Sequence, residues 1–404
     1  MFLTTIQRRL TMYCSHKRPG KYARHRDVSR LLPGMISALL ISLVSAFTAA
    51  DIPPIFQPPS DTVLIHAPPA ISGTRSTTPS TEPELARQIS LLLDENRRSG
   101  NSRPLGEAAA IFTAAGNQHY SLATRLLRAD LYQRLHQFKA ARVDLDAIVK
   151  KEPGNTRALL LLANLNLMQG YYRSAKKQCR QLSARGLSLI GNACMATVIG
   201  RTGKPQQAYT QLVNVYRGSY RASDRASRHW AALVLADLAE QLGSNEALNW
   251  WKKALLLAPE DTYTRLGISE YALRNQDYHR AIRYIDGMET DGALVIRAIA
   301  FDRLNDSNAT AIIKRLQDNY VELRWRGEIL HAHEYAWFLF ALCDDASSAL
   351  TLALHQWREQ KDPRDTALLL QIAREEKRND IVNSVNNWLA SWQQQDARFH
   401  NQTQ

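Results

Sequence analysis

Apolar residues recur at the three- and four-residue spacing of helices from residue 82 almost to the end of this chain. The pattern begins with "EPELARQISLLLDEN", and further helical patterns follow with short breaks between them. Runs that alternate apolar and polar residues, which would predict β-strands, are missing from this region. The sequence therefore predicts an all-α fold.

A small residue also returns at a nearly constant interval. Ala141, Ala175, Ala208, Ala247 and Ala281 each stand inside a helical pattern, and their separations are 34, 33, 39 and 34 residues. A period in the thirties is typical of helix pairs stacked into a solenoid. The chain is therefore expected to form a repeat array.

The stretch "NEALNWWKKALLLAPED", residues 245 to 261, shows why the interval exists. Two paired helices approach closely only where a small side chain such as Ala247 faces the neighbour, and Trp251 one turn later fills the gap between pairs. Pro259 ends the helix. Trp251 is expected in the core, whereas Trp250 points to another side of the helix and is expected at the surface.

Several stretches carry this spacing in register and resemble the tetratricopeptide-repeat (TPR) family. The matching positions are Ala129, Tyr132, Ala141, Leu145 and Pro153, then Ala163, Gly170 and Ala175, then Ala247, Trp251, Ala254 and Pro259. The match is good over about residues 122 to 287. The resemblance implies a right-handed superhelix of about seven or eight antiparallel helix pairs. We expect an N-terminal helical cap at 82–120, TPR-like repeats at 121–290 and divergent helical repeats at 291–394, followed by a disordered tail at 395–404.

In the TPR family the first helices of successive pairs line a concave groove that receives a peptide or a partner helix. Matching the register places these residues on that wall: Asp130, Arg134, Arg157, Asn164, Arg201, Asp237, Glu270 and Arg274. The family's clamp for a C-terminal carboxylate is missing, since Leu126 and Asp130 occupy its places in the first clear repeat. The resemblance implies a non-enzymatic scaffold that binds a protein segment.

The first 50 residues look like an export signal. A basic head precedes the uncharged run at 31–50, which ends in small residues before Asp51. Cleavage after Ala50 is one expectation, and an uncleaved membrane anchor with a cytoplasmic basic end is the other. Either places the body in the periplasm or on the extracytoplasmic face of an inner membrane, with an envelope protein as partner. Residues 51–81 are rich in proline and are expected to form a disordered linker.

The net charge of +13 is concentrated in the basic head, because residues 51–404 carry 43 basic and 37 acidic residues, or +6. This modest excess predicts no nucleic-acid partner. The insertion "YRGSYRASDRASRHW" at 216–230 suggests an alternative function: if it is helical, Arg217, Arg221, Arg225 and Arg228 form one stripe able to bind an anionic lipid or envelope glycan.

Cysteines and histidines give few chemical candidates. Cys179 and Cys194 lie about equally far from a turn near Gly186, so they either form a disulfide or serve as two small buried residues. Cys343 has no obvious mate. His331 and His333 are two residues apart, whereas a helical metal pair needs a separation of four. We expect a solvated or packing role for them, and no metal, cofactor or enzymatic activity.

Overall fold

The fold is built from helices alone. A computed structural model describes residues 79, 81–116, 119–186, 188–219, 223–326 and 332–400, and within these ranges it holds eighteen α-helices and no strand. The all-α prediction is therefore confirmed. The helices are α2 (Glu82–Ser99), α3 (Arg103–Ala115), α4 (Leu122–Arg134), α5 (Phe138–Lys151), α6 (Thr156–Met168), α7 (Tyr172–Ser183), α8 (Ser188–Arg201), α9 (Pro205–Gly218), α10 (Arg225–Gln241), α11 (Glu246–Leu257), α12 (Thr262–Arg274), α13 (Tyr278–Tyr284), α14 (Asp291–Arg303), α15 (Asn308–Arg326), α16 (Ala332–Leu342), α17 (Ala346–Glu359), α18 (Pro363–Glu375) and α19 (Asn379–Ser391).

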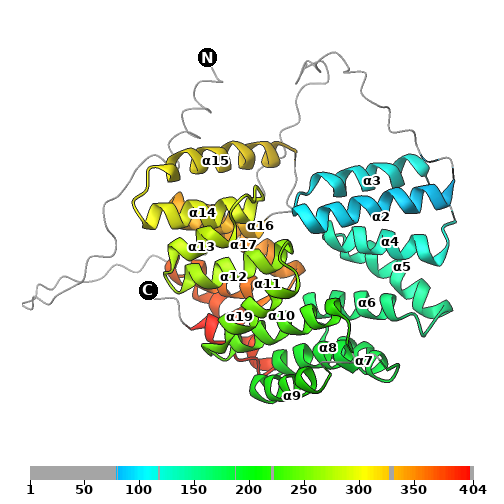
Figure 1. The fold of residues 1–404 in the computed structure, drawn as a ribbon. Helices are drawn as coiled ribbons and strands as arrows, with labels where there is room; N and C mark the ends of the chain where they lie inside the picture. Colours follow the sequence, from blue (N-terminus) through cyan, green and yellow to red (C-terminus); the bar gives the residue numbers. More distant parts are fainter. Residues whose placement is uncertain are drawn as a thin grey trace, which may run out of the picture.

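Consecutive helices pack two by two into a solenoid (Figure 1). The described helices make nine pairs, from α2–α3 to α18–α19, where the sequence led us to expect seven or eight. The solenoid returns on itself, because the end of α2 meets the start of α12, where the Thr262 hydroxyl donates to the Arg98 carbonyl oxygen at 3.1 Å. Gly100 ends α2 with φ 69°, and a Cβ atom there would lie 2.6 Å from the Thr262 side chain.

The periodic alanines lie where the helices approach most closely. All five, Ala141 to Ala281, are fully buried. Trp251 is buried too, and its ring lies against Gly267 of the next pair, where a Cβ atom would stand 2.3 Å from it. The expectation for Trp250 is wrong: it is buried, donates its indole N–H to the Tyr209 hydroxyl at 2.9 Å and packs edge-on against Tyr216. The two neighbouring tryptophans of α11 therefore contact α9 on one side and α12 on the other.

The end of the chain is ordered as far as residue 400, so the disordered tail predicted from residue 395 is wrong for residues 395–400. A short 3₁₀ helix, η1 (Ala397–Phe399), follows α19. Asp396 and Phe399 are both about 2% exposed. Figure 1 shows this last segment, in red, near α10 of the middle repeats, which η1 contacts. The C-terminal helices thus fold back onto the solenoid.

Candidate binding surfaces

The eight predicted wall residues all lie on the first helix of their pair, as the repeat register requires. Asp130 and Arg134 lie on α4, Arg157 and Asn164 on α6, Arg201 on α8, Asp237 on α10, and Glu270 and Arg274 on α12. Six of them form ion pairs with other residues of the chain. Arg157 and Asn164 form none in the part of the chain that the structure describes, so the wall has an open portion at these two residues.

Arg201 and Asp237 belong to an ion network with the C-terminal segment. The Arg201 guanidinium lies 3.0 Å from Asp237, and Arg398 places another guanidinium 2.8 Å from the second oxygen of the same carboxylate. Arg398 also contacts Asp396 at 2.6 Å. Burial alone would raise the pKa of Asp237, but the charges of Arg201 and Arg398 outweigh it and hold this pKa below its usual value.

Glu270 and Arg274 are occupied in the same way. Arg364, at the start of α18, donates to the Glu270 carboxylate, and Arg274 lies 3.7 Å from Glu270 and forms an ion pair with Glu240. Arg398 approaches Glu240 at 3.8 Å. Arg201, Asp237 and Glu270 therefore bind the chain's own C-terminal segment, whereas Arg274 pairs with carboxylates of the wall itself. For these four residues, the expectation that they face a partner does not describe this conformation.

Aromatic packing accompanies the ion network. The rings of Trp388 on α19 and of Trp392, which follows the helix, lie 6.0 and 5.0 Å from the ring of Tyr172, the first residue of α7. The buried Tyr172 hydroxyl donates to the Gln394 side chain at 3.3 Å. The backbone N–H of Lys361 donates to the Met168 carbonyl oxygen at 2.5 Å. The closure of the solenoid is therefore both apolar and ionic.

The wall residues of α4 hold the first helix pair in place. Asp130 and Arg134 form an ion pair at 2.8 Å, and Arg134 also donates to the Leu93 carbonyl oxygen and the Asn96 side chain on α2. Arg157 and Asn164 differ from the other six, because they are exposed and form no ion pair with any described residue, whereas Arg274, which is exposed too, pairs with Glu240. Within the described residues Arg157 makes no hydrogen bond or ion pair, and Asn164 contacts only Met168 of its own helix at 3.8 Å.

The proposed arginine stripe at 217–228 is not formed. α9 ends at Gly218 and α10 begins at Arg225, so the segment is not one helix, and Arg221 lies outside the described residues. Arg225 donates to the Leu257 carbonyl oxygen at 2.5 Å and caps the end of α11. Arg228 is buried against the Tyr216 ring at 4.3 Å. Of the four, Arg217 is exposed and the two on α10 are structural.

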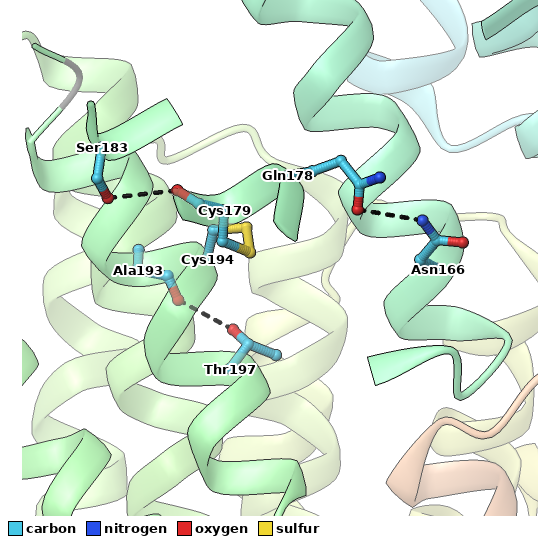
Figure 2. Close-up of a disulfide and its surroundings, with 7 residues drawn as sticks. All are labelled: Asn166, Gln178, Cys179, Ser183, Ala193, Cys194 and Thr197. Carbon is cyan, nitrogen blue, oxygen red and sulfur yellow. Dashed lines mark hydrogen bonds between the residues drawn. A yellow bond between two sulfur atoms is a disulfide. The ribbon is translucent and has the colours of Figure 1, made fainter. Parts of the chain in front are cut away.

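Cys179 and Cys194 are bonded to each other, with their Cα atoms 5.4 Å apart (Figure 2). The bond joins α7 to α8 within a buried seam. On either side of it Ser183 donates to the Cys179 carbonyl oxygen at 3.3 Å and Thr197 to that of Ala193 at 3.1 Å. Cys343 is buried just after α16.

His333 has a packing role, while His331 lies outside the described residues. The Nδ1 atom of His333 is 2.7 Å from the buried carboxylate of Asp365. The same carboxylate accepts a hydrogen bond from the Gln360 side-chain amide at 2.9 Å. Burial lowers the pKa of His333, but the hydrogen bond and charge of Asp365 raise it, and the net pKa lies above its usual value. The pair is an ion pair in a helix seam.

This pair predicts a pH dependence of stability. A raised folded pKa contributes stability that is complete below the unfolded value of about 6.5 and is lost as the pH rises through the folded pKa, by about 1.4 kcal/mol for each unit of difference. The urea midpoint of the parent should therefore fall from about pH 6 to about pH 9. The His333→Gln variant should lack this component; equal slopes for the two proteins would contradict the assignment.

The sequence interpretation missed the basic surface of α7. Arg173, Lys176, Lys177 and Arg180 are exposed along one side of this helix. A signal for it exists, because residues 153–223 contain no aspartate or glutamate and ten arginines and lysines. In the described part of the chain, no group of three His, Cys, Asp or Glu side chains is arranged to hold a metal ion. None of the helices described there combines the length and apolar character needed to cross a bilayer.

The comparisons with known proteins bear on the fold of this chain and on nothing finer. No protein-family model matches the chain, and no curated protein matches it. Among solved structures, the human IFIT1 dimer with m7Gppp-AAAA has 13% sequence identity and a TM-score of 0.38, covering 76% of this chain and 81% of that one. Yeast Tom70 has 11% identity, a TM-score of 0.24 and coverages of 76% and 92%. The P58(IPK) TPR domain has 14% identity, a TM-score of 0.20 and coverages of 74% and 99%. These identities and TM-scores are too low to infer a partner or an activity for this chain. The chain is similar to helical-repeat proteins.

Proposed function

We propose that this chain is a non-enzymatic scaffold of a bacterial cell envelope that binds an extended segment of a partner protein on the open part of its inner wall, at α6. The observation that carries the proposal is the contrast between the two halves of the wall. Arg157 and Asn164 are exposed and form no ion pair among the residues that the structure describes, whereas Arg201, Asp237 and Glu270 hold the C-terminal segment and Arg274 pairs with Glu240.

The chemistry of the two exposed residues suits a peptide. A side-chain amide such as that of Asn164 both donates to and accepts from a backbone, whatever the sequence of the segment. Arg157 adds a charged donor for a carboxylate. A solenoid supports this use because stacked repeats provide a long surface without a catalytic pocket.

Export is supported by two features of the chain. The uncharged run at 31–50, which lies outside the described residues, has the layout of an export signal or anchor. The Cys179–Cys194 disulfide favours an oxidising compartment, as the periplasm is. We therefore place the folded body in the periplasm or on the outer face of the inner membrane.

The test is in-cell crosslinking of the tagged full-length protein, with mass spectrometry of what co-purifies. The parent should capture one envelope protein, and the Arg157→Ala, Asn164→Ala double variant should lose it by about tenfold or more, corresponding to about 1.4 kcal/mol or more. A matched control is Asn249→Ala with Lys252→Ala, which removes one amide and one cation from exposed positions of α11. Equal capture by parent and double variant would overturn the assignment to α6. The same mass spectra identify the first residue of the purified protein. A protein that starts at Asp51 has been cleaved after Ala50, whereas a protein that keeps residues 1–50 is anchored.

A further inference from the structure

One face of α7 is a ridge of positive charge. The helix buries Tyr172, Ala175, Cys179 and Leu182 and turns its basic side chains outward. We name the exposed cations Arg173, Lys176, Lys177 and Arg180 the α7 ridge. They are three, one and three positions apart, which places them along one side of the helix over about 10 Å.

The neighbourhood of the α7 ridge lacks carboxylates that would neutralise it. The helices α6, α7, α8 and α9 contain none, because the acid-free window of the sequence covers them all. On the C-terminal side, Asp396 is buried and paired with Arg398, and Asp380 is paired with Arg378. Four like charges on adjacent turns repel one another, which costs about a few tenths of a kcal/mol per pair. An anionic partner would offset this repulsion.

A cavity of about 370 Å³ adjoins the ridge between α7, α8 and α19. Two ridge cations, Arg173 and Lys176, line it together with the hydroxyl groups of Thr202 and Ser391. Trp392 forms an aromatic wall, with the Arg173 guanidinium 5.9 Å from its ring centre. Cations and a ring at the edge of a small cavity suit the phosphate head of a single lipid.

The ridge is presented on a fixed support. The Cys179–Cys194 disulfide ties α7 to α8 (Figure 2). Cys179 belongs to the buried face of α7, which the exposed cations do not share. Gly191 of α8 lies so close to α7 that a Cβ atom there would be 2.6 Å from the Ser183 backbone nitrogen. Tyr171, immediately before α7, is 54% exposed. The Arg142 guanidinium of α5 lies 5.5 Å from its ring centre. An exposed tyrosine with a cation against its ring is found where proteins meet the boundary of a bilayer.

We propose that the α7 ridge and its cavity dock the protein onto a membrane surface containing anionic phospholipids, with one lipid phosphate in the cavity and others along the ridge. A lipid surface is favoured over a nucleic acid because α7 lies at the periphery of the molecule (Figure 1) and offers a short line of cations instead of a groove with successive stacking rings. The ridge is separate from the wall at Arg157 and Asn164, so either assignment can fail alone.

The experiment measures sedimentation of the full-length protein with vesicles of phosphatidylcholine, with and without phosphatidylglycerol. We expect binding to the mixed vesicles only. Each cation near an anionic surface strengthens binding by about fivefold, so the Lys176→Ala, Lys177→Ala, Arg180→Ala variant should bind about a hundredfold more weakly. Raising the salt from about 0.1 M to about 1 M, which shortens the Debye length from about 10 Å to about 3 Å, should release the parent.

A matched control removes three exposed cations elsewhere: Lys139, Lys252 and Arg283, each changed to alanine. This control has the same net charge as the ridge variant and should keep most of the binding. Equal losses in the two triple variants would overturn the proposal, since they would show a general effect of net charge. Release of the parent by millimolar inorganic phosphate, or binding to single-stranded DNA or an anionic polysaccharide that exceeds binding to the vesicles, would overturn it in favour of a soluble anion. Circular dichroism of each variant ensures that a loss reflects the surface and not unfolding.

Discussion

Replacing Arg398 by alanine is expected to destabilise the protein by about 3–5 kcal/mol, because a buried ion pair that loses one partner leaves an uncompensated charge. The Arg398 side chain is 9% exposed and lies among three carboxylates, those of Asp237, Asp396 and Glu240. Urea unfolding followed by circular dichroism measures the loss. Hydrogen exchange should show that α18, α19 and η1 lose protection first, since repeat arrays unfold by segments.

A matched control for Arg398→Ala is Arg378→Ala. Arg378 also pairs with an aspartate two residues away, Asp380, at 2.7 Å, but both side chains are at least half exposed. Exposed pairs contribute about 0–1 kcal/mol, so this variant should unfold nearly as the parent does. If the two variants lost the same stability, the closure of the solenoid by Arg398 would be refuted.

The same network predicts acid sensitivity. Because the pKa of Asp237 is lowered in the fold, its contribution is present above the unfolded value of about 3.9 and is lost as the pH falls through the folded value. In the Arg398→Ala variant one of the three arginine charges that lower this pKa is missing, so the loss of stability on acidification should be smaller than in the parent.

Replacing Trp251 by alanine is the second change with a large expected effect, about 3–5 kcal/mol from the cavity and lost packing alone. The ring fills the seam between two helix pairs above Gly267, and its N–H donates to the buried carboxylate of Glu240 at 2.6 Å. The midpoint of thermal or urea unfolding gives the magnitude.

The Trp251→Phe variant separates packing from hydrogen bonding. It keeps much of the ring and removes the donor to a charged group, a bond that contributes about 1.5–3 kcal/mol. We expect a loss of that size, smaller than the loss for alanine. A phenylalanine variant as unstable as the alanine variant would show that the ring does not support the seam, contrary to its position against Gly267.

The repeat pattern was predictable because it depends on contacts between neighbours in the sequence. Ala247 and Trp251 occupy positions set by the approach of adjacent helices, and both are buried as expected. Trp250 was misjudged because a residue on the outer side of one helix pair can be covered by the preceding one, here through Tyr209. The number of pairs was underestimated because the later helices lack the proline spacing.

The closure of the wall could not be read from the sequence. Arg398 and Asp237 are 161 positions apart, and Arg364 and Glu270 are 94 apart, so neither pair follows from a helical or repeat period. A register argument identifies which residues line a wall but not what covers it. The α7 ridge was predictable in principle, since a window without acids is visible in the sequence, whereas its neighbouring cavity depends on where α19 comes to lie.

Because the end of the chain covers the wall, the wall stays uncovered while the protein is being synthesised. The wall residue Asp237 leaves the ribosome 161 residues before its partner Arg398, and at about 5–20 residues per second this interval lasts about 8–30 s. During that time the middle repeats exist without the helices that cover them, and their charged wall is open to chaperones or to an early partner. A stop codon shortly before α18 would make this temporary state permanent.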